Sequence, residues 1–421
     1  MFRFSMLTSL SVAAAAPPGV KVRIVDEEVE ALDLGTEADL VGISFMTFNA
    51  PRAYELADRL RREYHRTVIV GGYHPTLCPE EAKAHADAVC IGEAEPVLPA
   101  MIRDYEAGRL QPFYRGAPSD LRGLRLPDRR LLRRASYVAA DAIQATRGCP
   151  YACTFCSVSA FHRRQFRRRP VEEVVAELQA LGRQIIFMDD NLVADRGYAA
   201  ELFSAMIPLR KRWVSQSSVT IGDDEGLMDL AARSGCCGLF LGLESLSQEG
   251  LRHWNKETNR ARDYTRLIRR LHARGIAVIV GIVLGHDWDT REVFRQTLEF
   301  LEDARVDALQ ATILTPFPGT PLFEEMSAQG RLIDRDWSHF DFGHVVFEPA
   351  RMTRADLERG HRWLLSQFYS RRRVATRLLR SFGYLTPGTI LRASAPLNLS
   401  YRARLRAAGI LDSPACAAPT G

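Results

Sequence analysis

Three cysteines, Cys149, Cys153 and Cys156, form a C-x3-C-x2-C group in one short segment. Thiolates at this spacing can converge on one metal centre, and as soft ligands they select zinc, copper(I) or an iron–sulfur cluster. A structural zinc site needs a fourth ligand, for which His162 is a solitary candidate. A 4Fe-4S cube ordinarily takes four cysteines, so three would leave one iron open to a substrate or cofactor. The residues by themselves leave a zinc site and an iron–sulfur site open.

The elements around this group alternate between strands and helices. The strands are short, β-branched apolar runs, expected at Ala142–Thr146, Ile185–Met188, Val214–Ile221, Leu239–Leu243, Ala277–Leu284 and Ala308–Leu314. Helices are expected between them, for example at Val171–Leu181 and at Tyr264–Ala273, which ends just before Gly275. Six such units in a row predict an incomplete barrel, related to the closed eight-fold form, with the cysteines directly after its first strand.

The N-terminal part predicts a separate α/β domain with a parallel sheet. Strands are expected at Val20–Val25, Leu40–Phe45, Val68–Val70 and Ala88–Ile91, and a helix at Ala50–His65. Such sheets bind ligands at the carboxyl ends of their strands, where this chain carries Ser44, Thr47, Gly71, Gly72, His74, Gly92 and Glu93. The spacing alone is equally compatible with ordinary turn glycines.

Residues 1–16 contain one arginine, an apolar middle and a run of alanines, a pattern that secretory signals share with helices. Pro17, Pro18 and Gly19 then provide a helix stop. We expect the first helix of the α/β domain here, because cysteines used for metal binding point to a reducing compartment, the cytoplasm.

The composition is that of a globular protein, with 46% apolar and 25% charged residues among 421. No apolar run reaches 18 residues, which argues against a membrane-spanning helix. The net charge of +5 is small and acidic residues are interspersed, so no nucleic-acid partner is expected. Arginines cluster at 163–169 and at 371–377, and we expect both clusters to be solvated helix surfaces, which does not favour membrane association.

The segment Thr146–Cys156 resembles the signature of the radical S-adenosylmethionine (radical SAM) superfamily, and the resemblance extends over about residues 140–347. It implies a partial (β/α)6 barrel in which Cys149, Cys153 and Cys156 bind three irons of a 4Fe-4S cluster. The amino and carboxylate groups of S-adenosylmethionine would then chelate the fourth iron. Reductive cleavage would give methionine and a 5′-deoxyadenosyl radical, which abstracts a substrate hydrogen.

The same resemblance implies further contacts to S-adenosylmethionine. Phe155 would pack on the adenine, and Asp190 would contact the methionine amino group at a place where the family more often has Gly-Gly-Glu. Glu244 would bind the ribose hydroxyls, and Gly281 and Gly285 would flank the adenine. Residues 315–320 would border the substrate cavity.

The N-terminal domain resembles the cobalamin-binding domain that precedes many such barrels, through residues 22–27, 41–47, 70–76 and 91–95. The resemblance implies a pocket for the cobalamin nucleotide tail lined by Ser44, Thr47, Gly71, Gly72 and His74. The chain lacks the Asp-x-His-x-x-Gly motif that supplies a histidine to cobalt, and the domain is expected to start at its first helix, without an opening strand.

These observations predict an α/β protein with a cobalamin-binding-like domain at 1–115, a linker at 116–136, a radical SAM partial barrel at 137–350 and a helical region at 351–421. The linker follows from the polar stretch Gly108–Arg134, which ends near Tyr137. The expected reaction is cobalamin-dependent methyl transfer to an unactivated carbon of a hydrophobic or cyclic metabolite. Radical cyclisation, rearrangement or oxidation without methyl transfer is the alternative, and a non-catalytic iron–sulfur or zinc protein is another. The expected partners are a small-molecule substrate and an electron donor such as flavodoxin or ferredoxin.

Overall fold

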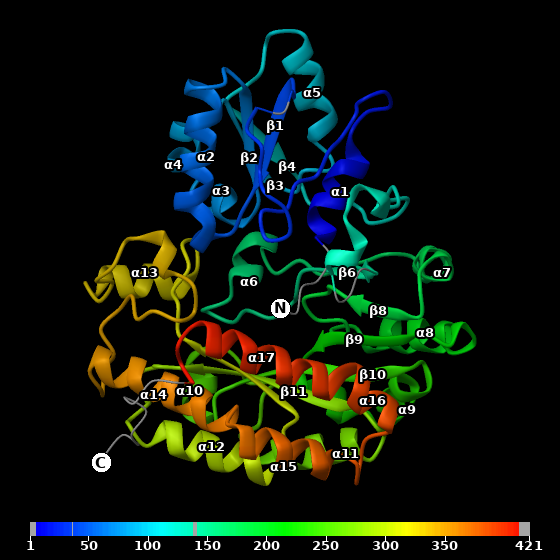
Figure 1. The fold of residues 1–421 in the computed structure, drawn as a ribbon, viewed down its shortest axis with the longest axis vertical. Helices are drawn as coiled ribbons and strands as arrows, with labels where there is room; N and C mark the ends of the chain where they lie inside the picture. Colours follow the sequence, from blue (N-terminus) through cyan, green and yellow to red (C-terminus); the bar gives the residue numbers. More distant parts are fainter. Residues whose placement is uncertain (1–5, 36, 138–140, 412–421) are drawn as a thin grey trace.

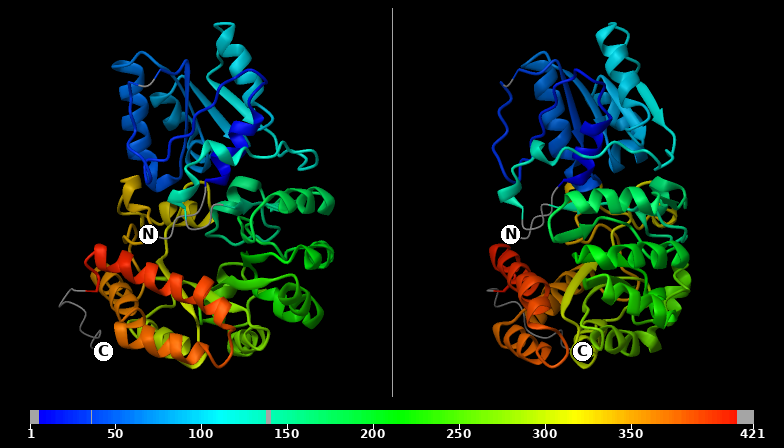
Figure 2. Two further views of the ribbon diagram at one scale, coloured as in Figure 1. Left: turned by 45° about the vertical axis from the view of Figure 1, so that its right-hand side comes forward. Right: turned by 90° about the vertical axis from the view of Figure 1, so that its right-hand side faces the viewer.

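The computed structural model describes residues 6–35, 37–137 and 141–411. An N-terminal α/β domain is stacked on a larger barrel-like domain, whose side is covered by the C-terminal helices (Figure 1). Two further views show the same stacking (Figure 2). The fold class expected from the sequence is confirmed.

The N-terminal sheet has four parallel strands in the order β1-β2-β3-β4. Its strands are β1 (Leu40–Ser44), β2 (Thr67–Gly71), β3 (Ala88–Gly92) and β4 (Phe113–Gly116). One face packs on α1 (Leu7–Ala15) and α5 (Leu98–Glu106), and the other on α2 (Ala50–Arg62) and α4 (Pro79–His85), while α3 (Tyr73–Leu77) follows β2. Because both faces are covered, the middle strands are apolar apart from Thr67 at the start of β2.

Two expectations for this domain are wrong. Val20–Val25 forms no strand, because Val22 alone packs on the apolar cluster around Met101 while Lys21 and Arg23 face solvent. Conversely, β4 lies in the polar stretch that the composition indicates as a linker. This segment forms a strand because it pairs with β3. The first helix is present as expected, and its Leu7 packs on strands of the second domain.

The second domain has six parallel strands in the order β12-β11-β10-β9-β8-β5. They are β5 (Ala142–Ile143), β8 (Gln184–Phe187), β9 (Arg212–Ser217), β10 (Cys236–Glu244), β11 (Ala277–Leu284) and β12 (Ala308–Ile313). The outer side packs on α7 (Val171–Ala180), α8 (Arg196–Met206), α9 (Glu225–Arg233), α10 (Gln248–His253), α11 (Tyr264–His272) and α12 (Val293–Asp303). The sheet order runs from one end to the other without closing, as expected for a partial barrel.

Of the six expected barrel strands, only Ala277–Leu284 has the expected bounds, and two of the others are partly replaced by different structure. The run 142–146 is divided into β5 and β6 (Thr146–Arg147), and β6 leaves the barrel sheet to pair antiparallel with β7 (Arg167–Arg168). This pairing brings the chain before and after the cysteines together. β9 ends at Ser217, and a 3₁₀ turn at Val219–Asp223 takes up the rest of the expected strand.

The C-terminal helices lie beside β12. They are α13 (Pro321–Ala328), α14 (Arg354–Phe368), α15 (Arg371–Ser381), α16 (Pro387–Thr389) and α17 (Ala395–Ala407), with a π-helical turn at Ile390–Ser394. The Tyr369 hydroxyl donates a hydrogen bond to Leu309 O (2.7 Å), and Asn398 Nδ2 donates to Asp307 O (2.8 Å). None of the helices in the described ranges has the length and apolar character needed to cross a bilayer.

Candidate active site

The cysteine loop runs from Gly148 to Cys156, between β6 and α6 (Ser157–His162). Cys153 is buried, Cys149 and Cys156 are half-buried, and all three thiols are free. Two backbone hydrogen bonds fix the loop to the barrel: Thr154 N donates to Trp254 O (3.2 Å), and Leu322 N donates to Thr154 O (3.1 Å). The loop is therefore held at the end of the barrel from two sides.

The arrangement of the three sulfurs suits a cluster better than a single ion. Among the described residues, only His74, Cys78 and Glu81 bring three potential ligand atoms within 4.8 Å of one another. Sulfurs bound to one zinc ion at about 2.3 Å in a tetrahedron would lie roughly 3.8 Å apart. A 4Fe-4S cube places each cysteine on a different iron, so it accepts the wider spacing. The donor set thus fits the iron–sulfur alternative.

Gly148 gives the loop its shape. Its φ of +79° lies in the left-handed region, and a Cβ built on it would lie 2.0 Å from Gln165 O. Its amide donates to Asp190 Oδ2 (2.9 Å). A side chain at this position would therefore push apart the two segments that flank the cysteines.

The residues after β8 contact the base of the cysteine loop. Asp189 is fully buried and accepts hydrogen bonds from Ala145 N (3.1 Å) and from the Thr146 hydroxyl (2.6 Å). Asp190 accepts from Gly148, and burial raises its pKa. Asn191 Nδ2 lies 3.9 Å from the Cys149 sulfur. In this arrangement Asp190 supports the loop, and Asn191 directs an amide toward a thiol.

Glu244 forms a buried ion pair beside the cysteines. Its Oε1 accepts a hydrogen bond from Lys256 Nζ (2.9 Å), and its φ is +65°. Burial opposes a charged ammonium, but Glu244 and the Cys153 thiolate raise the pKa of Lys256 above its usual value. Lys256 Nζ also lies 6.0 Å from the centroid of the Phe155 ring, which packs on Trp254 at 4.9 Å. A carboxylate, an ammonium and an aromatic ring thus surround the space next to Cys153.

Glycines on the inner side of the barrel allow neighbouring side chains to lie close to the strands. Gly242 and Gly281 are register partners on β10 and β11. A Cβ at Gly242 would lie 2.3 Å from Glu244 Oε1, and one at Gly281 would lie 2.8 Å from the Phe240 ring. Gly285 differs, because its missing Cβ faces Leu357 of α14 at 2.5 Å and its φ is +96°. Gly281 therefore belongs to the inner surface, whereas Gly285 allows a turn against the outer helices.

The N-terminal residues expected at a cofactor pocket gather at the carboxyl ends of β1 and β2. Ser44 is exposed, Gly71 and Gly72 are half-buried, and Thr47 and His74 are buried. Gly72 has a φ of +104°, and a Cβ there would lie 2.7 Å from Phe45 O. At this edge of the sheet the backbone therefore packs closely around Gly72, and Ser44 is accessible to solvent.

His74 lies behind this edge. Its Nδ1 lies 3.4 Å from the Thr47 hydroxyl, and its Nε2 lies 3.5 Å from Glu81 Oε1. Glu81 also accepts a hydrogen bond from Trp337 Nε1 (2.8 Å), which belongs to the second domain. Both ring nitrogens of His74 thus have partners, in keeping with the absence of a cobalt-ligand motif in the sequence.

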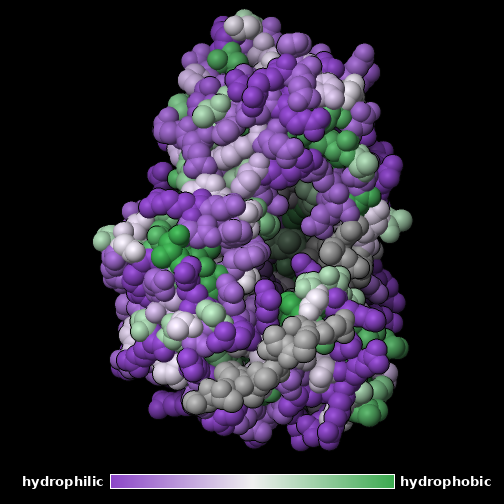
Figure 3. Space-filling model, turned by 60° about the vertical axis from the view of Figure 1, so that its left-hand side comes forward, coloured by the Kyte–Doolittle hydropathy of each residue, from purple (hydrophilic) through white to green (hydrophobic). Residues whose placement is uncertain are grey.

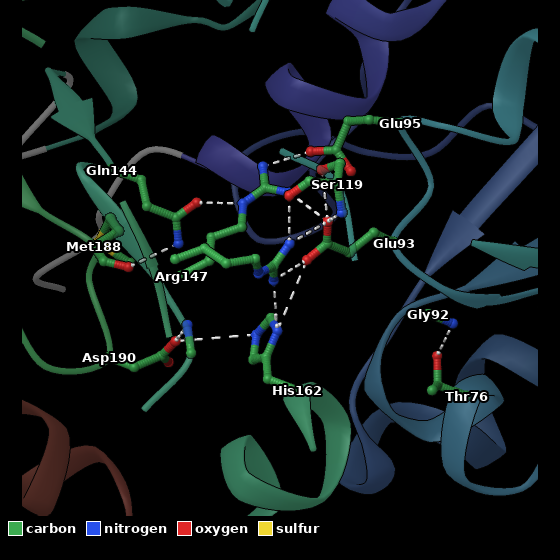
Figure 4. Close-up of polar contacts among 12 residues, drawn as sticks. Thr76, Gly92, Glu93, Glu95, Ser119, Gln144, Arg147, His162, Met188 and Asp190 are labelled. Carbon is green, nitrogen blue, oxygen red and sulfur yellow. Dashed lines mark hydrogen bonds and ion pairs between the residues drawn. The ribbon is translucent and has the colours of Figure 1, made fainter. Parts of the chain in front are cut away.

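Carboxylates at the end of β3 form ion pairs with arginines on both sides of the cysteine loop (Figure 4). Glu93 pairs with Arg167 and lies 3.4 Å from Arg147 Nη1, while Arg147 Nη2 donates to Glu95. Glu93 also accepts hydrogen bonds from Ser119 N (3.0 Å) and the Ser119 hydroxyl (2.8 Å). Although burial alone would raise it, the pKa of Glu93 is lowered to about 2, chiefly by Arg167. The N-terminal sheet is thereby attached to the chain entering and leaving the cysteine loop.

A second contact between the domains is aromatic. Tyr73, just after β2, stacks on Phe161 of α6 with ring centroids 4.6 Å apart. Burial raises the pKa of Tyr73, with further contributions from Asp190 and Cys156. A deep hollow with apolar atoms on its floor opens between the upper and lower parts of the molecule (Figure 3). The cysteines and the strand ends of the N-terminal sheet thus meet at one interface.

Sequence reasoning did not identify Lys256, Asn191, Tyr73 or Arg147. Lys256 lies in a polar stretch without periodicity, and its only signal is rarity, since the chain has four lysines among 56 basic residues. Arg147 lies within the segment Thr146–Cys156 and Asn191 directly follows Asp190, but the sequence alone gave neither of them a role.

Comparison with known families agrees with this geometry. Residues 143–301 match the radical SAM superfamily, and residues 10–102 match the B12 binding domain. The bacteriochlorophyllide d C-12(1)-methyltransferase of Chlorobaculum tepidum is 34% identical over 331 residues, which cover 75% of this chain and 71% of that protein.

Two other similarities bear on the reaction and the fold. The anaerobic magnesium-protoporphyrin IX monomethyl ester cyclase of Cereibacter sphaeroides is 26% identical, covering 72% of this chain and 55% of the cyclase. The structure of the radical S-adenosylmethionine methyltransferase TsrM from Kitasatospora setae, with cobalamin and a [4Fe-4S] cluster bound, superposes with a TM-score of 0.61. It is 18% identical and covers 84% of this chain and 81% of TsrM, a likeness of fold.

Proposed function

Because this chain belongs to the radical SAM superfamily and carries a B12 binding domain, we propose that it transfers a methyl group to an unactivated carbon of a cyclic, largely apolar small molecule. The observation that carries the proposal is the interface itself. A loop with three free thiols adjoins the strand ends of a B12 binding domain, and ion pairs from the residues on both sides of the loop hold the two together.

The enzyme uses a 4Fe-4S cluster, S-adenosylmethionine and cobalamin. When bound, these groups supply a one-electron reductant, a source of methyl and 5′-deoxyadenosyl groups, and a methyl carrier. We assign the cluster to Cys149, Cys153 and Cys156. Burial raises the pKa values of the Cys149 and Cys153 thiols, so loading the cluster must displace protons from them.

Lys256, Glu244 and Phe155 would bind S-adenosylmethionine. The Lys256 ammonium is a buried point charge that can meet the methionine carboxylate. Glu244 offers a carboxylate that can accept hydrogen bonds from the ribose hydroxyls, and the Lys256 pairing holds it in place. Phe155, and the Phe240 ring that packs on Gly281, offer flat apolar surfaces to the adenine. The role of Asp190 is to hold the Gly148 amide and hence the loop.

The N-terminal strand ends would hold cobalamin. Ser44 is accessible at the edge, and Gly71 and Gly72 allow a ligand to approach the backbone. His74 Nδ1 contacts the Thr47 hydroxyl, so the role of His74 would be to hold Thr47 in position. No residue of this set offers a free imidazole, so the strand-end loops themselves would hold the cobalamin.

The inner side of the barrel supports an apolar substrate with a few polar groups. Ile279 and Val283 lie on the same side of β11 as Gly281, and Gln216 of β9 and Gln310 of β12 add amides to the two flanks. The methyltransferase relative from Chlorobaculum tepidum is named for a bacteriochlorophyllide. We therefore propose a tetrapyrrole or a ring system of similar polarity as the substrate class.

The second candidate is radical ring closure without methyl transfer. It is favoured by the similarity to the magnesium-protoporphyrin monomethyl ester cyclase. Both candidates use the same cysteines and the same S-adenosylmethionine site. They differ in whether the methyl group of S-adenosylmethionine appears in the product.

The test is anaerobic reconstitution followed by turnover with S-adenosylmethionine that carries a labelled methyl group. We expect about four iron per chain and a cobalamin absorption spectrum that survives gel filtration. With a chlorophyllide-type substrate, label in the product supports methyl transfer. Unlabelled cyclised product supports the second candidate, and zinc without iron contradicts both.

A low-potential donor such as flavodoxin or ferredoxin would reduce the cluster, and we place the enzyme in the cytoplasm, where thiols stay reduced. The proposed donor is testable by replacing dithionite with reduced flavodoxin. Release of 5′-deoxyadenosine under that condition supports it.

A further inference from the structure

The C-terminal segment presents large apolar side chains to solvent. Ten such side chains are exposed among the described residues, and the four most exposed all lie between 371 and 411. They are Leu379 (72%), Leu391 (72%), Phe382 (61%) and Leu399 (58%). Single exposed apolar residues are ordinary, but this concentration in one segment indicates a surface that another body covers.

The four side chains belong to α15 and its C-terminal cap, to the π-helical turn at Ile390–Ser394 and to α17. Leu379 and Phe382 are three residues apart at the end of α15, away from its buried Val374. Leu391 and Leu399 each follow a buried residue, so they share the exposed side of the next segment. Arg377 Nη1 of α15 donates a hydrogen bond to Asn398 Oδ1 of α17, which joins the two helices. We call this surface, residues 371–407, the C-terminal face.

The C-terminal face is strongly cationic. Residues 371–411 contain nine arginines and neither aspartate nor glutamate. Two of the arginines serve the fold, Arg373 by pairing with Glu302 and Arg377 by stacking on Phe368 at 3.6 Å. Within the described residues, no ion pair is formed by the exposed arginines 371, 372, 380 and 404. Uncompensated positive charge therefore surrounds the exposed apolar groups.

This combination selects among possible occupants. A second copy of the chain would bring the exposed arginines of this face against the same arginines of its partner in a two-fold contact, which is unfavourable. An anionic lipid surface instead attracts the guanidinium groups and accepts leucine and phenylalanine at the boundary of headgroups and acyl chains. We propose that the C-terminal face docks the enzyme on the surface of an anionic lipid bilayer.

The position of α17 next to the barrel suggests what the docking does for the substrate. The Tyr401 hydroxyl donates to Gln310 Oε1 (3.3 Å), and Gln310 lies on the inner side of β12. A bilayer against the C-terminal face would therefore lie next to the edge of the barrel. An apolar substrate dissolved in the lipid would have a short path to that edge. The docking itself is independent of the reaction proposed above.

The experiment is sedimentation of the full chain with vesicles of phosphatidylcholine alone or with about 30% phosphatidylglycerol. We expect binding to the anionic vesicles, weakened by salt, and little binding to the neutral ones. Replacing Arg372, Arg380 and Arg404 with Gln should lower the partition coefficient about 100-fold, since each arginine near such a surface adds about a factor of five. Replacing Leu379, Phe382 and Leu391 with Ser should lower it about 10-fold or more.

Two controls keep the interpretation specific. Arg183→Gln, Arg210→Gln and Arg233→Gln remove the same charge from exposed positions just before β8, β9 and β10 and should leave binding unchanged. Circular dichroism should give all variants the same melting curve. The proposal is overturned if the chain binds neither vesicle, if both triple variants bind like the parent, or if light scattering shows a dimer that Leu379→Ser disrupts while vesicles are ignored.

Discussion

Removing the charge of Glu93 should loosen the interface that holds the cysteine loop. Glu93 is 6% exposed and shares its carboxylate between Arg167, Arg147 and Ser119. In Glu93→Gln, Arg167 keeps a hydrogen bond to Ser119 O (2.9 Å) but loses its ion pair. Breaking a buried pair from one side costs about 3–5 kcal/mol. A fall in the carboxyl pKa from 4.5 to about 2 corresponds to about 3 kcal/mol, so we expect about that loss in the free energy of unfolding.

The assay is urea unfolding of the cluster-free chain at pH 7, read by circular dichroism. The control is Glu63→Gln, which removes an exposed partner of Arg59 (3.4 Å) and should cost less than about 0.5 kcal/mol. The Glu93 contribution is present above the unfolded pKa and is lost as pH falls through the folded one. The difference between Glu93→Gln and the parent should therefore shrink between about pH 4.5 and pH 2.

A double variant identifies the partner. Glu93→Gln combined with Arg167→Gln should cost at least about 1 kcal/mol less than the sum of the single losses, because the buried charge is no longer orphaned. Strict additivity would refute the coupling, and so would a Glu93→Gln loss no larger than that of Glu63→Gln.

Three further predictions concern the site itself. Gly148→Ala should unfold at a lower urea concentration and retain less iron than Gly108→Ala. Both glycines have a positive φ, but a Cβ at Gly108 meets nothing within 4 Å, whereas one at Gly148 meets Gln165 O. Equal behaviour of the two variants would show that the close contact with Gln165 has no effect. Cys153→Ala should lose the reconstituted cluster, whereas Cys90→Ala, at a buried position of the N-terminal sheet, should keep about four iron per chain. Iron analysis measures the difference. About four iron per chain in Cys153→Ala would contradict the assignment. Glu244→Ala should weaken S-adenosylmethionine binding about 10- to 100-fold in calorimetry with iron content unchanged, and an unaltered dissociation constant would exclude Glu244 from the ribose.

The strands that the sequence predicted best are those whose side chains are buried by neighbours on both sides. Ala277–Leu284 is an uninterrupted apolar run, and β11 has the same bounds. The strand β4 could not be found this way, because Phe113–Gly116 has two apolar residues and depends on pairing with β3. Val20–Val25 has the opposite character, with strand-like residues but no partner strand among the described residues. Pairing across the sheet is the property that local patterns do not contain.

The candidate site divides in the same way. The thiols of the cysteine loop are close in sequence, and their spacing alone predicted a metal centre. The Lys256–Glu244 pair joins residues on either side of a helix, and the Glu93–Arg167 pair joins two domains. These contacts exist only after the chain has folded, so no motif predicts them.

The ion pairs between Glu93, Glu95, Arg147 and Arg167 also bear on how such two-domain enzymes can be recombined. A chimaera that takes its B12 domain from one relative and its barrel from another would inherit carboxylates from one parent and guanidinium groups from the other. Where the new parent has an uncharged residue at one of these positions, an unpaired charge would be buried at the interface between the two domains. Exchanges between relatives should therefore succeed only when the carboxylates and the arginines that pair with them are transferred together.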